Sequence, residues 1–165
     1  MKWIQSNGGP LVLIPRVHLD VWHGIEREVG DSMTHYDRAC AVEADVAVLR
    51  VQGIDVLVLG DEPFSTAWVP EHNGGLLVRW VYADSEKAII DSIRSNSLSP
   101  TLMPNGVSFP AAGPCRLFDA AEPGAHILGH SLDLDLVGGQ YAVTSAMVSP
   151  SRDLRLLVHR LLLRD

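Results

Sequence analysis

The sequence predicts an α+β fold: a mainly antiparallel β-sheet with one helix at about residues 85–94, in a single domain over residues 1–165. Short segments rich in Val, Ile and Leu alternate with turns that contain glycine or proline, a pattern typical of β-hairpins. One segment combines a capping residue with apolar side chains at helical spacing. The 165 residues are 47% hydrophobic, which suits one globular core.

The first strands are indicated by the turns that bound them. Leu11–Ile14 is an apolar run of strand type that follows the turn at Gly8–Gly9. These glycines do not form a phosphate-binding loop, because the next residue is proline, which has no N–H to donate, and no helix follows. The next two strands, Val46–Val51 and Ile54–Leu59, are separated by Gln52–Gly53 and are expected to form a hairpin.

A second pair of strands and the helix follow. Thr66–Val69 and Leu76–Ala83 are separated by a proline and by Asn-Gly-Gly, which indicates a turn between two strands. Asp84 or Ser85 can accept hydrogen bonds from the free N–H groups at the start of a helix. The apolar stripe of this helix consists of Ala88, Ile89, Ile90 and Ile93.

The second half begins with an irregular segment. Ser95–Gly113 holds three prolines, and we expect a long connection that is a candidate binding loop. Cys115–Ala120 and His130–Val137 are expected to be strands. In the second, leucines at 132, 134 and 136 alternate with aspartates at 133 and 135, which predicts one buried face and one acidic face. Gly138-Gly139 turns into Gln140–Val148, which predicts a second hairpin.

Residues 153–163 fit two structures. The leucines and Val158 match a helical stripe, and Ser149-Pro150 would suit the start of that helix. Ser149–Asp153 would equally form a turn into a last antiparallel strand. We prefer the strand, because it extends the preceding hairpin.

The charge is acidic and unevenly placed. The formal net charge is −7, and residues 51–78 and 117–148 contain Asp and Glu but neither Lys nor Arg. Nucleic-acid binding depends on Lys and Arg that neutralise phosphates, so nucleic acid is not the expected direct partner. The acidic surface favours a cationic partner instead. No signal peptide and no run of eighteen apolar residues occur, so we expect a cytoplasmic protein without a membrane partner.

Few residues are candidates for catalysis or metal binding. Cys115 with His126 or His130 is the pair to consider for a thiol nucleophile, but nothing in the sequence places either imidazole beside the sulfur. The spacing of these residues does not match a zinc module. We therefore expect no catalytic constellation, no metal and no cofactor. Trp68 follows an acidic turn and fits either the core or an interface anchor, a role in which tryptophan is enriched.

Four stretches of the first half match the pattern of a known family. They are WIQSNGGPLVLIP at residues 3–15, HYDRACAVE at 35–43, GDEPFSTAWVP at 60–70 and GGLLVRWVYAD at 74–84. Together and in this order they resemble family 21 of the bacterial immunity proteins, which are encoded beside toxins of polymorphic toxin systems. The resemblance implies an α+β protein that neutralises a cognate toxin. The matched positions include Trp3, Ser6, Gly8, Gly9, Pro10, Tyr36, Asp37, Arg38, Gly60, Asp61, Trp68, Arg79 and Asp84.

The resemblance and the charge pattern together predict a stoichiometric binding protein that is not an enzyme. Its expected partner is a cognate protein toxin, for example a basic nuclease. The acidic stretches indicate a toxin-binding surface around Asp61, Glu62, Asp133 and Asp135, with Trp68 as an anchor. The alternatives are a small hydrolase or metal-dependent enzyme that uses Cys115, His126 and His130, and a ligand-binding domain closed by the segment 95–113.

Overall fold

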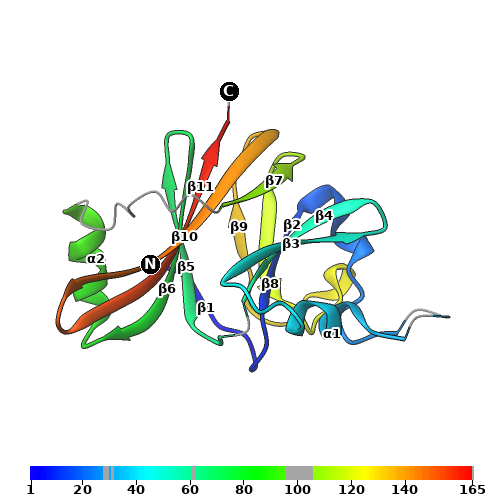
Figure 1. Ribbon diagram of the computed structural model, residues 1–165, viewed down its shortest axis with the longest axis horizontal. Helices are drawn as coiled ribbons and strands as arrows, with labels where there is room; N and C mark the ends of the chain where they lie inside the picture. Colours follow the sequence, from blue (N-terminus) through cyan, green and yellow to red (C-terminus); the bar gives the residue numbers. More distant parts are fainter. Residues whose placement is uncertain (28–29, 31, 61, 96–105, 165) are drawn as a thin grey trace.

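The strands form two antiparallel sheets that face each other (Figure 1). A computed structural model describes residues 1–27, 30, 32–60, 62–95 and 106–164. The six-stranded sheet has the order β1-β5-β6-β11-β10-β7 and the five-stranded sheet the order β3-β4-β2-β8-β9. The predicted α+β fold with mainly antiparallel strands is confirmed.

The bounds of the strands are as follows. The six-stranded sheet consists of β1 (Trp3–Ile4), β5 (Ser65–Glu71), β6 (Gly74–Ala83), β7 (Val107–Ala111), β10 (Gly139–Ser151) and β11 (Leu154–Leu163). The five-stranded sheet consists of β2 (Leu11–Pro15), β3 (Val46–Val51), β4 (Ile54–Leu59), β8 (Cys115–Asp119) and β9 (Leu132–Leu134).

The core between the sheets follows from the alternation of side chains along each strand. On β2, Leu11 and Leu13 belong to the apolar cluster between the sheets, whereas Val12 and Ile14 belong to a cluster on the opposite face. On β6, Leu77 faces the core and Leu76 faces away from it. Both faces of the central strands are therefore buried, which explains why these strands are mostly apolar, with the buried Arg79 and His159 as exceptions.

Helices cover the outer face of each sheet. The predicted helix is confirmed as α2 (Glu86–Arg94): the Ser85 hydroxyl oxygen accepts a hydrogen bond from the Ala88 N–H at 3.3 Å, and Ile89 is buried against the six-stranded sheet. A second helix, α1 (His35–Cys40), was not predicted. It lies over the five-stranded sheet with the 3-10 segments η1 (Arg16–Val21) and η2 (Gly124–His126).

The predicted pairs β3–β4 and β5–β6 are confirmed as hairpins, but the hairpin predicted around Gly138-Gly139 is wrong, because β9 pairs with β8 in one sheet and β10 with β7 and β11 in the other. β3 and β4 have the expected bounds, and their turn uses the left-handed region, with φ of 48° at Gln52 and 84° at Gly53. β10 pairs with β11, which shows that residues 153–163 contain a strand and not a helix. β11 also pairs with β6 and joins the two halves of the chain in one sheet.

Two segments differ from the sequence predictions. The expected irregular connection Ser95–Gly113 contains β7, which pairs with residues 139–143 of β10, while residues 96–105 lie outside the described part of the chain. β7 is an edge strand and accommodates Pro110, because its outer side needs no N–H donor. The expected strand His130–Val137 is shorter: β9 ends at Leu134, where its carbonyl oxygen accepts from the Leu136 N–H at 2.9 Å and closes a turn around Asp135.

Among the described residues, no helix is long and apolar enough to cross a lipid bilayer.

Candidate functional site

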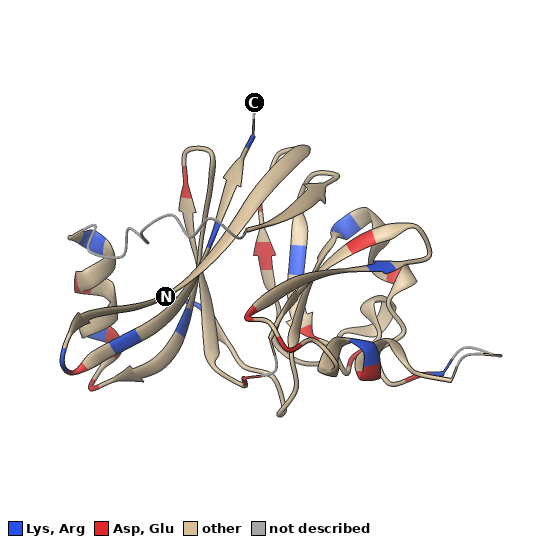
Figure 2. Cartoon of the chain, viewed as in Figure 1, with Lys and Arg blue, Asp and Glu red and all other residues tan. Residues whose placement is uncertain are grey.

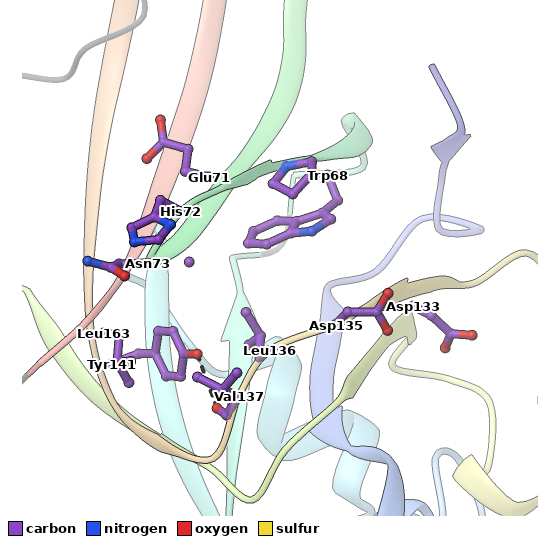
Figure 3. A pocket seen from close by; sticks show the side chains of 12 residues that line it. Trp68, Glu71, His72, Asn73, Asp133, Asp135, Leu136, Val137, Tyr141 and Leu163 are labelled. Carbon is purple, nitrogen blue, oxygen red and sulfur yellow. Dashed lines mark hydrogen bonds between the residues drawn. The ribbon is translucent and has the colours of Figure 1, made fainter.

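A groove opens between the β5–β6 hairpin of the six-stranded sheet and the segment that follows β9 in the five-stranded sheet (Figure 3). We call it the Trp68 groove, and its volume is about 350 Å³. In Figure 3 the Trp68 indole lies between the side chains of the hairpin tip and those of the β9 segment. The lining residues are Trp68, Pro70, Glu71, His72, Asn73, Gly74, Asp133, Asp135, Leu136, Val137, Tyr141 and Leu163.

The groove brings together three of the five residues that the sequence analysis predicted for toxin binding. Trp68 comes from β5, Asp133 from β9, and Asp135 from the turn after β9. Trp68 is partly buried and packs against the core between the sheets. Leu132, Leu134 and Leu136 are buried while Asp133 and Asp135 are exposed, so the predicted alternation is confirmed.

The two aspartates of the groove differ in their charge environment. Asp133 lies opposite Arg116 on β8 and accepts hydrogen bonds from Arg116 Nε at 2.7 Å and Nη2 at 3.1 Å. These bonds hold the pKa of Asp133 below its usual value and compensate much of its charge. Asp135 has no ion pair within the described part of the chain. Asp135 is therefore the carboxylate that is available to a partner.

Sequence reasoning missed the other residues of the groove. Glu71, near the tip of the β5–β6 hairpin, accepts a hydrogen bond from Arg160 Nη2 on β11 at 3.3 Å. The Tyr141 hydroxyl donates to the Val137 carbonyl oxygen at 3.1 Å and fixes the segment between β9 and β10. Figure 2 shows acidic positions on β9 and near the tip of the β5–β6 hairpin. Only the acidity of Glu71 was visible in the sequence; its place beside Trp68 and Asp135 depends on the pairing of distant strands.

Glu62 lies in a different cleft, of about 400 Å³. Its lining includes two further exposed carboxylates, those of Glu43 and Asp45, together with Cys40 and Arg79. The predicted acidic surface is thus divided between two clefts. Glu62 lies in the connection between β4, which belongs to the five-stranded sheet, and β5, which belongs to the six-stranded sheet. Asp61, also predicted for toxin binding, lies outside the described residues.

Arg79 holds the connection between the two sheets. Its side chain on β6 is 1% exposed, and Nη2 donates to the carbonyl oxygens of Gly60, at 3.2 Å, and of Glu62. The guanidinium carbon lies 5.5 Å from the centre of the Phe64 ring. Burial lowers the pKa of Arg79 to about 10, opposed by the nearby carboxylates of Asp45 and Glu62. The Arg79 side chain therefore links two of the stretches that resemble the family, residues 60–70 and residues 74–84.

The residues of the alternative enzyme are not arranged as a catalytic pair. The Cys115 thiol is fully buried and donates to the Gly113 carbonyl oxygen at 3.4 Å, and burial raises its pKa to about 12. A thiol in this environment is not ionised at neutral pH and is a poor nucleophile. His126 and His130 are exposed at the surface. Within the described residues, no group of three or more His, Cys, Asp or Glu side chains is placed to hold a metal ion.

Comparison with known protein families supports the resemblance found in the first half of the chain and extends it into the second half. The sequence model of the family described as immunity protein 21 matches residues 2–153, which includes β7 to β10 as well as the four motif stretches. No curated protein and no solved structure gives a significant match. Since the family match covers most of the chain, this protein belongs to the immunity protein 21 family.

Proposed function

We propose that this protein neutralises a cognate bacterial toxin by binding it in a one-to-one complex that covers the toxin's active site or substrate groove. The observation that carries the proposal is the family match over residues 2–153. Inhibition by occlusion needs no catalytic residues in the inhibitor. The protein acts as a binding partner in the cytoplasm of the cell that makes the toxin, and not as an enzyme.

The contact surface that we propose is centred on the Trp68 groove. A large, partly buried aromatic side chain surrounded by polar groups is the usual composition of an energetic anchor in a protein interface. Asp135 adds an uncompensated charge at the rim. The carboxylates of Glu43, Asp45 and Glu62 around the second cleft extend the acidic surface, and Asp61 precedes Glu62 in the sequence.

The net charge of −7 favours a basic toxin. Enzymes that cleave nucleic acid carry positive charge in order to bind phosphates, so a nuclease is the toxin class that this surface suits best. The inhibitor would then occupy the positively charged groove in place of the nucleic acid, and it would not bind nucleic acid itself.

Co-expression with the toxin encoded beside the gene tests the function. We expect the toxin alone to stop growth and the pair to restore it, and purification should yield a complex with one copy of each chain. Growth arrest despite co-expression, with no complex in size-exclusion chromatography, would rule out the proposed function.

Association kinetics test the surface. Asp135→Lys should slow association and reduce its dependence on salt, because steering by opposite charges acts mainly on the association rate. Asp153→Lys is the matched control, since Asp153 lies in the turn before β11, at the opposite end of that strand from Leu163 in the groove. Equal rates for both variants would place the interface elsewhere on the molecule.

A further inference from the structure

The Trp68 groove combines an apolar channel with acidic edges. In the view of Figure 3, Leu136, Val137, Tyr141 and Leu163 line its lower part and the Trp68 indole its upper part. Carboxylates stand at both sides, Glu71 on the hairpin and Asp133 and Asp135 on the β9 segment. None of the described residues that line it is Lys or Arg. A group with an apolar stem and a positive head matches both parts of this lining.

The groove is held in shape by contacts that need no partner. Trp68 packs on the core between the sheets, and the Tyr141 hydroxyl is bonded to the Val137 carbonyl oxygen at 3.1 Å. The turn at Asp135 is closed by the hydrogen bond from the Leu136 N–H to Leu134. A site that is formed before binding loses little conformational entropy when a ligand enters.

We infer that the Trp68 groove is a receptor for one arginine side chain of the toxin, an inference that rests on the proposed function. The methylene stem lies along the accessible apolar side chains of Val137 and Leu163, and the planar guanidinium stacks on the Trp68 indole and faces Asp135. Arginine suits this site better than lysine, because its flat, weakly hydrated head stacks on an aromatic face while its N–H groups bond a carboxylate.

The second cleft does not offer the same chemistry. Although Glu43, Asp45 and Glu62 line it, so does the buried Arg79, with Nε and Nη1 unpaired within the described residues. A second guanidinium would approach that positive charge directly. Among the described residues that line the Trp68 groove there is no Lys or Arg, and Arg116 and Arg160, which approach two of its carboxylates, are bonded to Asp133 and Glu71.

The inference can be tested on the free protein, without the toxin. We would titrate ¹⁵N-labelled protein with N-acetylarginine amide and follow the indole N–H signal of Trp68, assigned by its absence in Trp68→Phe. The control ligand is N-acetylcitrulline amide, which has the same shape without the charge. We expect a saturable shift with the arginine compound, binding roughly tenfold weaker for citrulline, and weakening by added salt.

A pair of variants locates the binding. Asp135→Asn should weaken binding of the arginine compound by about three- to tenfold, because it removes the charge partner and keeps the shape. Asp153→Asn, at the far end of β11, should leave binding unchanged. Both changes are at exposed positions, so neither is expected to prevent folding.

The possible results separate this inference from the proposed function. No saturable shift of the Trp68 signal, equal binding of citrulline, or equal effects of the two variants would overturn the arginine receptor. If the toxin complex forms nonetheless, the proposed function stands with a different anchor. Conversely, binding of the arginine compound by a protein that fails to bind the toxin would overturn the proposed function, and with it the toxin as the source of the arginine, but not the affinity of the groove for arginine.

Discussion

Gly75 on β6 lies directly against the indole of Trp68 on β5. A Cβ atom at position 75 would come within 2.5 Å of Trp68 Cη2 and would also crowd the carbonyl oxygen of Val69. Only glycine leaves space for the indole in its observed position. The second glycine of the Gly74-Gly75 pair is therefore explained by close packing, and it determines where Trp68 stands in the groove.

Gly75→Ala should displace the Trp68 indole and destabilise the protein. The added methyl group overlaps both the ring and the backbone of β5, so we expect the free energy of unfolding to fall by about 1–3 kcal/mol. Urea unfolding measures the loss, and the indole N–H signal of Trp68 reports the displacement. Gly138→Ala is the control, because its Cβ would meet nothing closer than 3.9 Å. An unchanged Trp68 signal in Gly75→Ala would contradict this prediction, because it would show that the backbone of β6 shifts to make room for the methyl group while the indole stays in place.

Arg79→Met should destabilise the connection between the sheets. Loss of the guanidinium leaves the Gly60 and Glu62 carbonyl oxygens without their donor, and we expect a decrease of about 1–3 kcal/mol in the free energy of unfolding. Urea unfolding measures this decrease. Arg152→Met, at an exposed position in the turn between β10 and β11, should change stability by no more than about 0.5 kcal/mol. Equal stability of the two variants would mean that Arg79 does not hold the connection.

The local features of the fold could be predicted from the sequence. The turn at Gln52-Gly53 and the cap at Ser85 act over a few residues, and both lie where the sequence indicated. The alternation of leucine and aspartate at 132–136 likewise identified the buried face of β9. Helix α1 was missed because six residues are too few for an apolar repeat; its start is determined by Thr34 and Asp37, each of which accepts a hydrogen bond from the other's N–H.

The assembly of the site could not be predicted, because it depends on which distant strands are neighbours. Trp68 and Asp135 meet only because β5 and β9 belong to different sheets that pack face to face. Glu62 is close to Trp68 in the sequence but lies in another cleft, since the chain crosses between the sheets at that point. Asp133 was predicted for toxin binding together with Asp135, and its ion pair with Arg116 could not be foreseen because it depends on the register between β8 and β9.

Cys115 should be inert in the folded protein. Its pKa is raised to about 12 by burial, so almost no thiolate exists at pH 8. We expect iodoacetamide to leave Cys115 unmodified in buffer and to modify it in concentrated urea, as measured by mass spectrometry of the peptide that contains it. Cys115→Ser provides the blank for this peptide. Rapid modification of Cys115 in the native protein would reopen the enzyme alternative.

The stability of the protein should fall on acidification because of His159. This side chain is completely buried on β11, its Nδ1 lies 2.6 Å from the Ser145 hydroxyl, and burial with the nearby charge of Arg79 lowers its pKa to about 3. In the unfolded chain the imidazole takes up a proton near pH 6.5. The stabilising contribution of neutral His159 is therefore complete above pH 6.5 and is lost progressively as the pH falls toward 3.

Between pH 6.5 and 4.5 the carboxylates with lowered pKa values, such as Asp133, remain largely ionised in both states and contribute little to the slope, and comparison with a His159 variant separates the contribution of His159 from that of the other histidines. We expect the free energy of unfolding to decrease by up to about 1.4 kcal/mol per pH unit in this range, the value for one proton. His159→Gln should reduce the slope by the contribution of this one proton, whereas Ser145→Ala, which keeps the imidazole buried, should retain it. Urea unfolding of the three proteins at several pH values measures the slopes, and equal slopes in His159→Gln and the native protein would show that another group takes up the proton.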